Sequence, residues 1–411
     1  MAAENRTKYW RRRILFTLWL TYASFYLCRV NISIAIPKMI QDLGFSKTAM
    51  GGVLSSFLLI YCLGQFFSGR LGDKFGARRL VSLGILGSAL LNLLFGFSKG
   101  FIIMLVIWGL NGLFQSTGWA PMMGTLANWF PDGKRGRVGG IMGTSYLVGT
   151  IFTWISVGFF IDALGWRWGF WIPSLIFALL GFHWYLRVRD EPKDVKMEGQ
   201  PGGENSNVGT ENGRMKDHSL RSDLTSSTVI YSAFSLLFLN VVRYGVLGWI
   251  PTYISGLQEF SISMVTLESS IVPLGGIVGV LGAGWLSDKF TGRRRGLLGS
   301  IMGVFLGVTL IFSHHLFTNL ILLLLGLFVL GVTINGPNIL LAGLIPIDVG
   351  EGETTSSIAG FLNGVGYIGG IVTGFATGLF IDMFGWSGAF HFWEVSAFLS
   401  SFFMWMTSRK E

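Results

Sequence analysis

The chain contains Gly69-Arg-Leu-Gly-Asp-Lys-Phe75 and, later, Gly284-Trp-Leu-Ser-Asp-Lys-Phe290, and the aspartates of these two similar heptapeptides lie 215 residues apart. Three further matches occur in the same order at offsets of 214 to 220 residues. They pair Arg29 with Arg243, Pro121 with Pro337, and Phe160-Ile-Asp-Ala-Leu-Gly-Trp166 with Phe380-Ile-Asp-Met-Phe-Gly-Trp386. Four ordered matches at nearly one offset predict that the chain consists of two similar halves.

The segments between these motifs are strongly apolar. Hydrophobic residues make up 51% of the 411 residues and charged residues 13%, which is about half the charged fraction of a soluble protein. An apolar run of about 20 residues is long enough to cross a bilayer as a helix. Polar residues divide the sequence into twelve such spans, near 14–37, 47–69, 79–98, 101–126, 138–161, 166–187, 228–254, 266–287, 296–313, 318–346, 355–381 and 386–408.

Twelve spans in two similar halves predict an all-α membrane protein built from two parallel six-helix repeats. An offset of six spans preserves the orientation of each helix, so the repeat axis lies along the membrane normal. We expect an N-terminal bundle over 1–189 and a C-terminal bundle over 228–411. The polar segment 190–227, rich in glycine and asparagine, is expected to be a flexible cytoplasmic linker.

The distribution of basic residues predicts the orientation of the chain. If the N-terminus lies inside, the inner segments hold 25 of the 31 lysines and arginines, the outer loops four and the spans two. The positive-inside rule then places both termini in the cytoplasm. We expect the plasma (inner) membrane, with an organelle membrane as the alternative. The net charge of +9 follows from this bias and from contact with anionic lipid headgroups, so no nucleic-acid partner is expected.

Arg29 and Arg243 are the only lysines or arginines away from the ends of the expected spans. A charged side chain there costs at least about 2.5–3.5 kcal/mol on insertion scales. Each arginine follows the cytoplasmic start of its helix by about 15 residues, or roughly 22 Å, so the repeat predicts that the two face each other across a central cavity. Two guanidinium forks suit bidentate binding of an oxyanion. We therefore predict a small anionic substrate.

The alternative for each arginine is a structural ion pair with a buried carboxylate. Asp162 and Asp382 fall at outer helix ends, however, and Glu268 lies near the outer end of its span. Two arginines in an empty closed cavity would be costly, so a carrier of this kind should reorient easily only with an anion bound. The expected mode of transport is therefore exchange.

Four segments resemble the organophosphate:phosphate antiporter family of the major facilitator superfamily: Tyr22–Asn31, Gln115–Pro121, Val242–Tyr253 and Gly366–Gly370. The resemblance covers both halves, apart from the linker. It implies a monomeric secondary transporter that exchanges a sugar phosphate or a glycerol-3-phosphate-like ester for inorganic phosphate by rocker-switch alternating access. It also implies that Arg29 and Arg243 grip the phosphate. The other binding positions are then Tyr22, Tyr26, Tyr61, Trp119, Tyr146, Tyr367, Gln65 and Asn335.

The sequence departs from the bacterial members of that family at four of its expected binding positions. Val30 stands where a lysine often follows the first arginine, and Gln65 replaces a second lysine. Tyr146 stands at the place of a histidine and Asn335 at that of a tyrosine. Fewer cationic groups lower the positive potential of the pocket, which favours a monoanionic or smaller substrate over a dianionic sugar phosphate.

The segment Gly69–Arg79 resembles the superfamily's motif between the second and third helices, with a partial copy at 284–295. An acidic residue beside a basic cluster suits a charge-linked latch that breaks as the halves move. The alternative is an ordinary charged loop. The expected latch residues are Gly69, Asp73, Arg78, Arg79, Asp288 and Arg293.

Three other functions compete with phosphate exchange. Two arginines would also bind a carboxylate, as in a carrier of sugar acids. A relative that binds sugar phosphate without transporting it, as a sensor, is a second alternative. The third is an enzyme, but the sequence has no nucleophile–base pair, no metal-ligand spacing and no phosphate-cradling glycine loop. No enzymatic activity, cofactor or metal is therefore expected.

Overall fold

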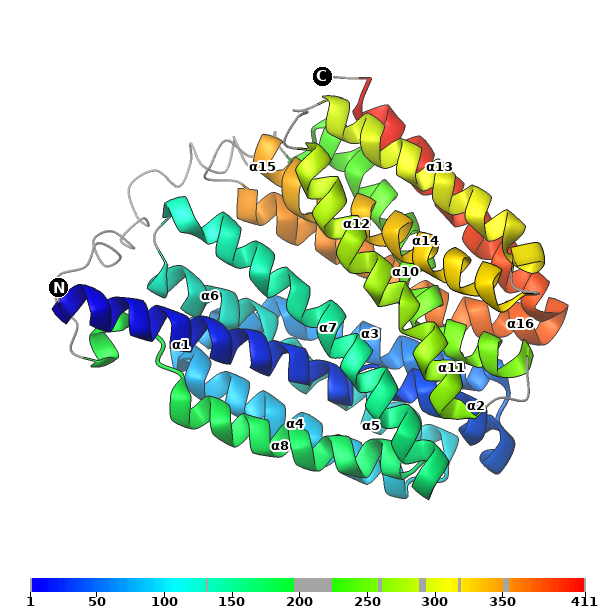
Figure 1. Ribbon diagram of the computed structural model, residues 1–411, viewed down its shortest axis with the longest axis horizontal. Coiled ribbons are helices and arrows are strands. Elements are labelled where there is room, and N and C mark those ends of the chain that lie inside the picture. The colour runs from blue at the N-terminus through cyan, green and yellow to red at the C-terminus, as the bar shows by residue number, and fades with distance from the viewer. Residues whose placement is uncertain are drawn as a thin grey trace. The chain divides into compact units, whose positions relative to one another are not determined.

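The computed structural model describes residues 2–130, 132–195, 224–257, 261–287, 293–316, 319–349 and 355–409. Every regular element in these ranges is helical (Figure 1). Ten helices there are long and apolar enough to cross a membrane. The prediction of an all-α membrane protein is thus confirmed.

Several of the expected spans differ from a single straight helix. The first consists of α1 (Ala2–Phe25), a short 3-10 turn η1 (Tyr26–Cys28) and α2 (Asn31–Leu43). The last two spans are joined in α16 (Thr355–Thr407), which bends at Gly385. The other elements are α3 (Lys47–Phe75), α4 (Ala77–Phe97), α5 (Phe101–Ser116), α6 (Trp119–Trp129), α7 (Asp132–Leu164), α8 (Trp168–Arg187), η2 (Pro192–Val195), α10 (Ser227–Leu257), α11 (Ile262–Ser269), α12 (Ile271–Ser287), α13 (Arg293–Leu316), α14 (Leu320–Ile339), the π-helix η3 (Leu340–Leu344) and α15 (Ile345–Val349).

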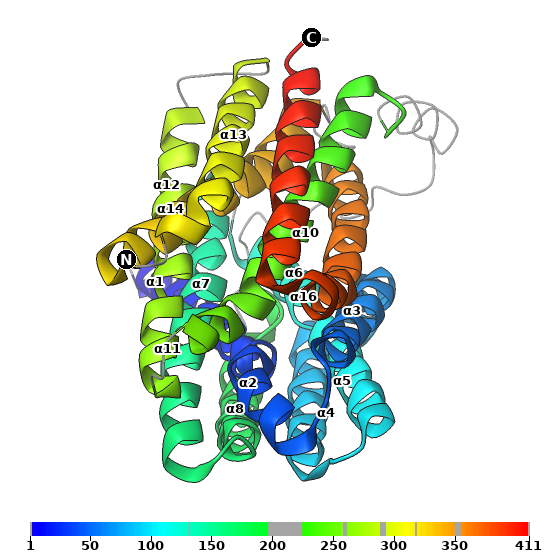
Figure 2. The same cartoon turned by 90° about the vertical axis from the view of Figure 1, so that its right-hand side faces the viewer.

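The chain forms two compact units. The first unit comprises Met1–Met39 and Ser56–Val208, and the second comprises Ile40–Ser55 and Gly209–Glu411. In the first unit, α4 packs between α5 and α8, and α1 packs against α7 and α8 (Figure 1). In the second, α10 packs along α16 and α12 along α14 (Figure 2).

The start of α3 belongs to the second unit. The Asp382 carboxylate on α16 accepts hydrogen bonds from the backbone N–H and the hydroxyl of Thr48, both at 2.7 Å. Seven residues further on, the Ser55 hydroxyl donates to the carbonyl oxygen of Ile371 at 2.6 Å. A carboxylate at a helix N-terminus satisfies amide groups that have no partner within the helix. Asp382 therefore anchors the first turn of α3 to α16.

The repeated segments at 160–166 and 380–386 share a backbone feature. Gly165, which follows α7, has φ of +95°, and Gly385, inside α16, has φ of +69°. A Cβ atom at either glycine would meet nothing within 4 Å. Glycine is therefore needed at both positions for its left-handed backbone and not for lack of space.

Glycines also allow α12 and α14 to pack closely. A Cβ atom on Gly331 would overlap the carbonyl oxygen of Val272, and one on Gly275 would overlap that of Phe328. Small residues at such contacts let membrane helices approach until their backbones touch. The α12–α14 pair is therefore held by backbone contact.

We expect Gly331→Ala to destabilise the protein by about 1–3 kcal/mol, because the added methyl group must push α14 away from Val272. The matched control is Gly282→Ala on α12, where a Cβ atom would meet nothing within 4 Å. The midpoint of thermal denaturation in detergent should fall in the first variant only. Equal midpoints would contradict the close packing of α12 and α14.

Candidate functional site

Arg29 lies at an interruption of the first membrane span. The helix α1 ends at Phe25, the turn η1 follows, and α2 begins at Asn31. Arg29 has φ of −121° and ψ of −48°, and its N–H donates to the carbonyl oxygen of Tyr26 at 3.2 Å. The guanidinium therefore projects from a non-helical stretch of backbone inside the first unit.

Three side-chain amides satisfy the carbonyl groups at this interruption. Gln115 Nε2 donates to the Phe25 carbonyl at 3.2 Å. Asn111 Nδ2 and Asn92 Nδ2 donate to the Cys28 carbonyl at 2.8 and 3.2 Å. Backbone groups at membrane depth must be satisfied within the protein, because no water is available there. The amides on α4 and α5 thus stabilise the interruption.

The same Gln115 holds the guanidinium. Arg29 Nε donates to Gln115 Oε1 at 3.1 Å, and Gln115 Nε2 also donates to the Ser88 hydroxyl at 2.8 Å. Ser88 donates in turn to Asn111 Oδ1 at 2.6 Å. The interruption and the arginine therefore depend on one connected network of buried polar side chains.

The network extends to the start of α2. Asn31 Nδ2 donates to Asn92 Oδ1 at 3.1 Å and to the Gly169 carbonyl at 3.0 Å. Asn92 is completely buried, as is Asn31. Both ends of the interruption are consequently tied to the same group of amides.

Aromatic rings surround the Arg29 guanidinium. Its Cζ lies 4.8 Å from the centre of the Tyr61 ring, 5.0 Å from that of Tyr26 and 5.9 Å from that of Phe57. These distances allow cation–π attraction. The faces of these rings attract the positive charge of the guanidinium and cover part of it.

Three more of the expected binding residues lie beside these rings. The Tyr22 ring is 4.6 Å from that of Trp119 and 6.1 Å from that of Tyr26. The Tyr146 ring is 6.1 Å from that of Tyr26. The structure thus brings together the expected aromatic residues of the first half around Arg29. Gln65 is half-buried on α3, one turn beyond Tyr61.

Arg243 has a different setting in the second unit. It lies within the uninterrupted helix α10, and its Cζ is 5.3 Å from the centre of the Tyr244 ring. The Tyr244 ring is 6.1 Å from that of Tyr367 on α16. Asn335 is buried on α14, and its Nδ2 donates to the Gly331 carbonyl of the same helix at 3.0 Å. The two arginines are equivalent in sequence but have different backbone settings.

The expected latch residues are only partly described. Gly69 and Asp73 lie within α3, and Arg293 begins α13. The side chains of Asp73 and Arg293 lie outside the described part of the chain, as does the whole of Asp288. Arg79 is exposed. Arg78 Nε donates to the Tyr185 carbonyl at 2.7 Å, and its guanidinium lies 4.3 Å from the centre of the Tyr185 ring.

Asp190 links the start of α4 to the segment after α8. Its Oδ1 accepts the N–H of Arg78 at 2.9 Å. Burial raises the pKa of Asp190, and the bond from the Arg78 N–H opposes that effect. Gly76, with φ of +80°, leaves room beside this carboxylate. Asp190 therefore acts as a helix cap supplied from a distant segment.

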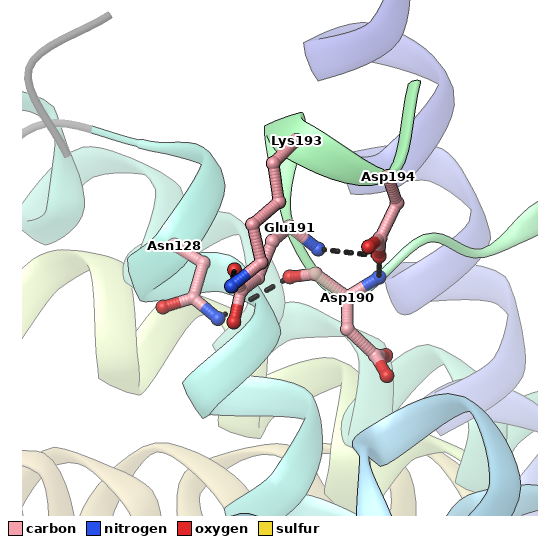
Figure 3. Close-up of polar contacts among 5 residues, drawn as sticks. All are labelled: Asn128, Asp190, Glu191, Lys193 and Asp194. Atoms are coloured by element: carbon pink, nitrogen blue, oxygen red, sulfur yellow. Dashed lines mark hydrogen bonds and ion pairs between the residues drawn. The ribbon is translucent and has the colours of Figure 1, made fainter. Parts of the chain in front are cut away.

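The backbone around Asp190 is fixed from two sides (Figure 3). The N–H groups of Asp190 and Glu191 both donate to Asp194 Oδ2 at 3.1 Å, and Asn128 Nδ2 donates to the Asp190 carbonyl at 3.3 Å. Lys193 pairs with Glu191. Figure 3 shows the Asp190 carboxylate directed away from Asp194. Because Asp194 and Asn128 bond to the backbone of Asp190, the carboxylate of Asp190 is available to cap α4.

The chain matches the family model of the Major Facilitator Superfamily over residues 18–374. This match spans most of the chain, so the protein belongs to that superfamily of membrane transporters, and it is not an enzyme. Within the superfamily it is a member of the organophosphate:phosphate antiporter family, as its relatives show.

Three curated relatives carry this assignment. The glycerol-3-phosphate transporter of Bacillus subtilis is 30% identical, with 97% of this chain and 92% of the relative covered. A probable hexose phosphate transport protein of Chlamydia pneumoniae is 28% identical, covering 94% and 89%. The membrane sensor protein UhpC of Escherichia coli is 27% identical, covering 97% and 92%.

Solved structures with the same fold are more distant in sequence. A bacterial homologue of the human lysosomal transporter Spinster, inward-facing and unoccupied, has a TM-score of 0.78 and 15% identity over 97% of both chains. The nucleoside transporter NupG has a TM-score of 0.73 and 14% identity over 98% of this chain and 100% of the other. These likenesses show the fold alone.

Sequence reasoning did not select the amides that hold Arg29. Asn92, Asn111 and Gln115 are polar residues inside apolar spans, which is a signal, because such residues are rare in membrane helices and need partners. The spacing of these polar residues was a second signal. Asn92 follows Ser88 by four residues, and Gln115 follows Asn111 by four, so the two residues of each pair lie on one helical face.

We expect Gln115→Leu to lower stability by about 1–3 kcal/mol, because it removes the hydrogen bonds that Gln115 makes to the buried Phe25 carbonyl and to the Arg29 guanidinium. Ser116→Ala is the matched control, since that hydroxyl donates to the Leu113 carbonyl of its own helix and takes no part in the network around Arg29. Thermal denaturation in detergent would measure both variants. A midpoint for Gln115→Leu as high as that of Ser116→Ala would contradict the network.

Removing the cap at the start of α4 should loosen its first turn. Asp190→Ala is expected to cost about 0.5–2 kcal/mol and to speed hydrogen–deuterium exchange of the Arg78 amide. Asp194→Ala is the control, because Asp194 binds the amides of residues 190 and 191. It should speed exchange there and not at Arg78. Equal exchange at Arg78 in both variants would exclude Asp190 as the cap.

Proposed function

We propose that this protein exchanges an organic phosphate ester, such as a sugar phosphate or a glycerol-3-phosphate-like compound, for inorganic phosphate, with Arg29 and Arg243 binding the phosphoryl group. One observation carries the proposal: the Arg29 guanidinium is held at an interruption of a membrane helix by Gln115 and by two tyrosine rings. The names of the relatives, a hexose phosphate and a glycerol-3-phosphate transporter, supply the substrate class.

A guanidinium held in this way suits a phosphoryl group. Its Nε is engaged by Gln115 at 3.1 Å, so the planar group is fixed in orientation before the substrate arrives. Arginine donates to phosphate through a rigid fork, and charge-assisted bonds of this kind are about twice as strong as neutral ones. Preorganisation reduces the entropy that binding must offset.

The charge of the site supports exchange over one-way transport. A cation that is partly removed from water is stabilised when an anion neutralises it. Reorientation with the site loaded therefore requires less free energy than reorientation with the site empty. Each outward step then needs one phosphate compound and each inward step another.

The departures from the bacterial pattern shape the substrate preference we propose. Val30 and Gln65 supply no positive charge, and Tyr146 supplies a phenol near Tyr26. With Arg29 and Arg243 as the principal cations, the pocket should favour a monoanionic or compact phosphate ester over a bulky dianion.

The proposal includes the arrangement of the chain in the membrane. Bundles over 1–189 and 228–411 rock about the substrate, the latch motifs govern that motion, and both termini lie in the cytoplasm. The protein acts as a monomer in a plasma (inner) membrane. The excess of basic residues in the expected inner segments supports this orientation.

Uptake of labelled inorganic phosphate into proteoliposomes tests the proposed exchange. Vesicles would be preloaded with phosphate, a sugar phosphate, glycerol 3-phosphate, a sugar acid or buffer alone. Uptake that requires an internal phosphate compound supports exchange. Uptake into vesicles holding buffer alone would overturn it, and flux of the sugar acid alone would indicate a carboxylate carrier.

We expect Arg29→Lys and Arg243→Lys each to reduce phosphate exchange about tenfold or more, because lysine cannot supply the guanidinium fork. Arg167→Lys is the control, since that arginine stacks at 4.4 Å on Trp166 between α7 and α8. It should retain wild-type exchange. Wild-type exchange in Arg29→Lys would exclude that arginine as the phosphate grip.

A sensor function is the second candidate, and it rests on the relative named as the membrane sensor protein UhpC. A sensor of this fold would bind the ester without moving it. Binding of a sugar phosphate to the purified protein, with no exchange in vesicles, would favour the sensor and overturn the transporter.

A further inference from the structure

Glu268 is a buried carboxylate without a hydrogen bond. It lies in α11, within the candidate span Ile262–Ser287, and its side chain is 5% exposed. Both carboxylate oxygens are buried, and neither has a hydrogen-bond partner among the residues that the structure describes. The proposed exchange of phosphate compounds depends on Arg29 and Arg243 and gives this carboxylate no role.

The hydroxyl groups next to Glu268 are already used. Thr266 Oγ1 donates to the Ser263 carbonyl at 2.8 Å. Ser269 donates to the Val265 carbonyl at 2.7 Å, and Ser270 donates to that of Thr266 at 2.7 Å. Each of these hydroxyl groups donates to a backbone carbonyl of α11, so none of them donates to the Glu268 carboxylate.

The helices packed against α11 are α10, α12 and α14. Among their described residues, Arg243 on α10 is the only formally charged side chain. The other titratable groups on these helices are the phenols of Tyr231, Tyr244 and Tyr253, all on α10. None of these groups is hydrogen-bonded to the oxygens of Glu268.

Asp382 of the same unit shows the contrasting case. Its oxygens accept three hydrogen bonds, from the N–H and hydroxyl of Thr48 and from the N–H of Lys47. Such bonds stabilise an ionised carboxylate. An ionised carboxylate buried without them costs several kcal/mol, and a buried group in that position takes up a proton instead.

We propose that Glu268 is a proton-binding site, occupied in the conformation described here and emptied elsewhere in the transport cycle. This inference rests on the proposed exchange of phosphate compounds. Phosphate monoesters lose their second proton near pH 6, so monoanions and dianions coexist close to neutral pH. Exchange of one for the other moves a net charge unless a proton crosses as well.

The proton balance at Glu268 is simple. The carboxyl O–H bond breaks when water reaches the group, the proton passes to that water, and an ionised carboxylate remains. Uptake of a proton from water restores the neutral acid before the group is buried again. One proton then crosses in the same direction as the dianion, so the exchange of a monoanion for a dianion is electroneutral.

Infrared difference spectroscopy of the purified protein in lipid tests the bound proton without relying on transport. At neutral pH we expect the carbonyl band of a protonated carboxylic acid in the wild type, and its loss in Glu268→Gln. Asp382→Asn is the control and should keep the band, because Asp382 is hydrogen-bonded as an anion. The same spectrum for wild type and Glu268→Gln would overturn the proposal.

Movement of the proton is tested in vesicles that contain inorganic phosphate and a potential-sensitive dye, with an alkaline interior and an acidic exterior so that a monoanion enters and a dianion leaves. Added glycerol 3-phosphate should produce no membrane potential with the wild type, because the proton leaves with the dianion. Glu268→Gln should exchange phosphate and produce a potential that is positive inside, and Glu268→Asp should abolish that potential. A potential with a wild type that exchanges phosphate would overturn the coupling, as would exchange by Glu268→Gln without a potential. Absence of phosphate exchange in the wild type would count against the proposed transport and leave the infrared result standing.

Discussion

The first unit depends on two hydrogen bonds of Gln115, which accepts one from Arg29 and donates the other to the Phe25 carbonyl. A membrane offers no water to a backbone carbonyl, so a helix can be interrupted there only where the protein supplies donors. Gln115 supplies one and orients the guanidinium with its other end. Asn111 and Asn92 complete the set at the Cys28 carbonyl. The break in the helix and the position of the charge therefore have a single cause.

Most of the fold could be predicted from the sequence, because a bilayer restricts the chain so strongly. A segment that crosses the bilayer has to be an apolar helix of about 20 residues. The polar residues between the apolar segments therefore indicated where each span begins and ends. The match between 160–166 and 380–386 was one basis for predicting two similar halves, and the glycines at its end, Gly165 and Gly385, both have positive φ. What could not be predicted was the interruption at residues 26–30. That stretch contains no proline or glycine, whereas α10 continues through Pro251. The interruption depends on amides from α4 and α5, which are distant in the sequence.

The aromatic surroundings of Arg29 were partly predictable for the same reason. Tyr22 and Tyr26 are one helical turn apart, so their proximity follows from local geometry. Tyr61 and Trp119 were assigned by resemblance, and only the fold brings them close. Gln115 was not selected, although it begins one of the segments that carry the family resemblance, because the sequence does not show which carbonyl group an amide will bind. Its importance becomes visible only when the partners of Arg29 and Phe25 are known.

The different settings of the two arginines have a consequence for how such a protein can diverge. Arg243 stands on a continuous helix, so its neighbours do not have to satisfy the backbone groups of an interruption. Arg29 shares its network with Ser88, Asn92, Asn111 and Gln115, and the loss of any one leaves a buried polar group unsatisfied. Descendants of this chain should therefore acquire new substrate preferences through changes in the second half, while the first half is inherited almost unaltered.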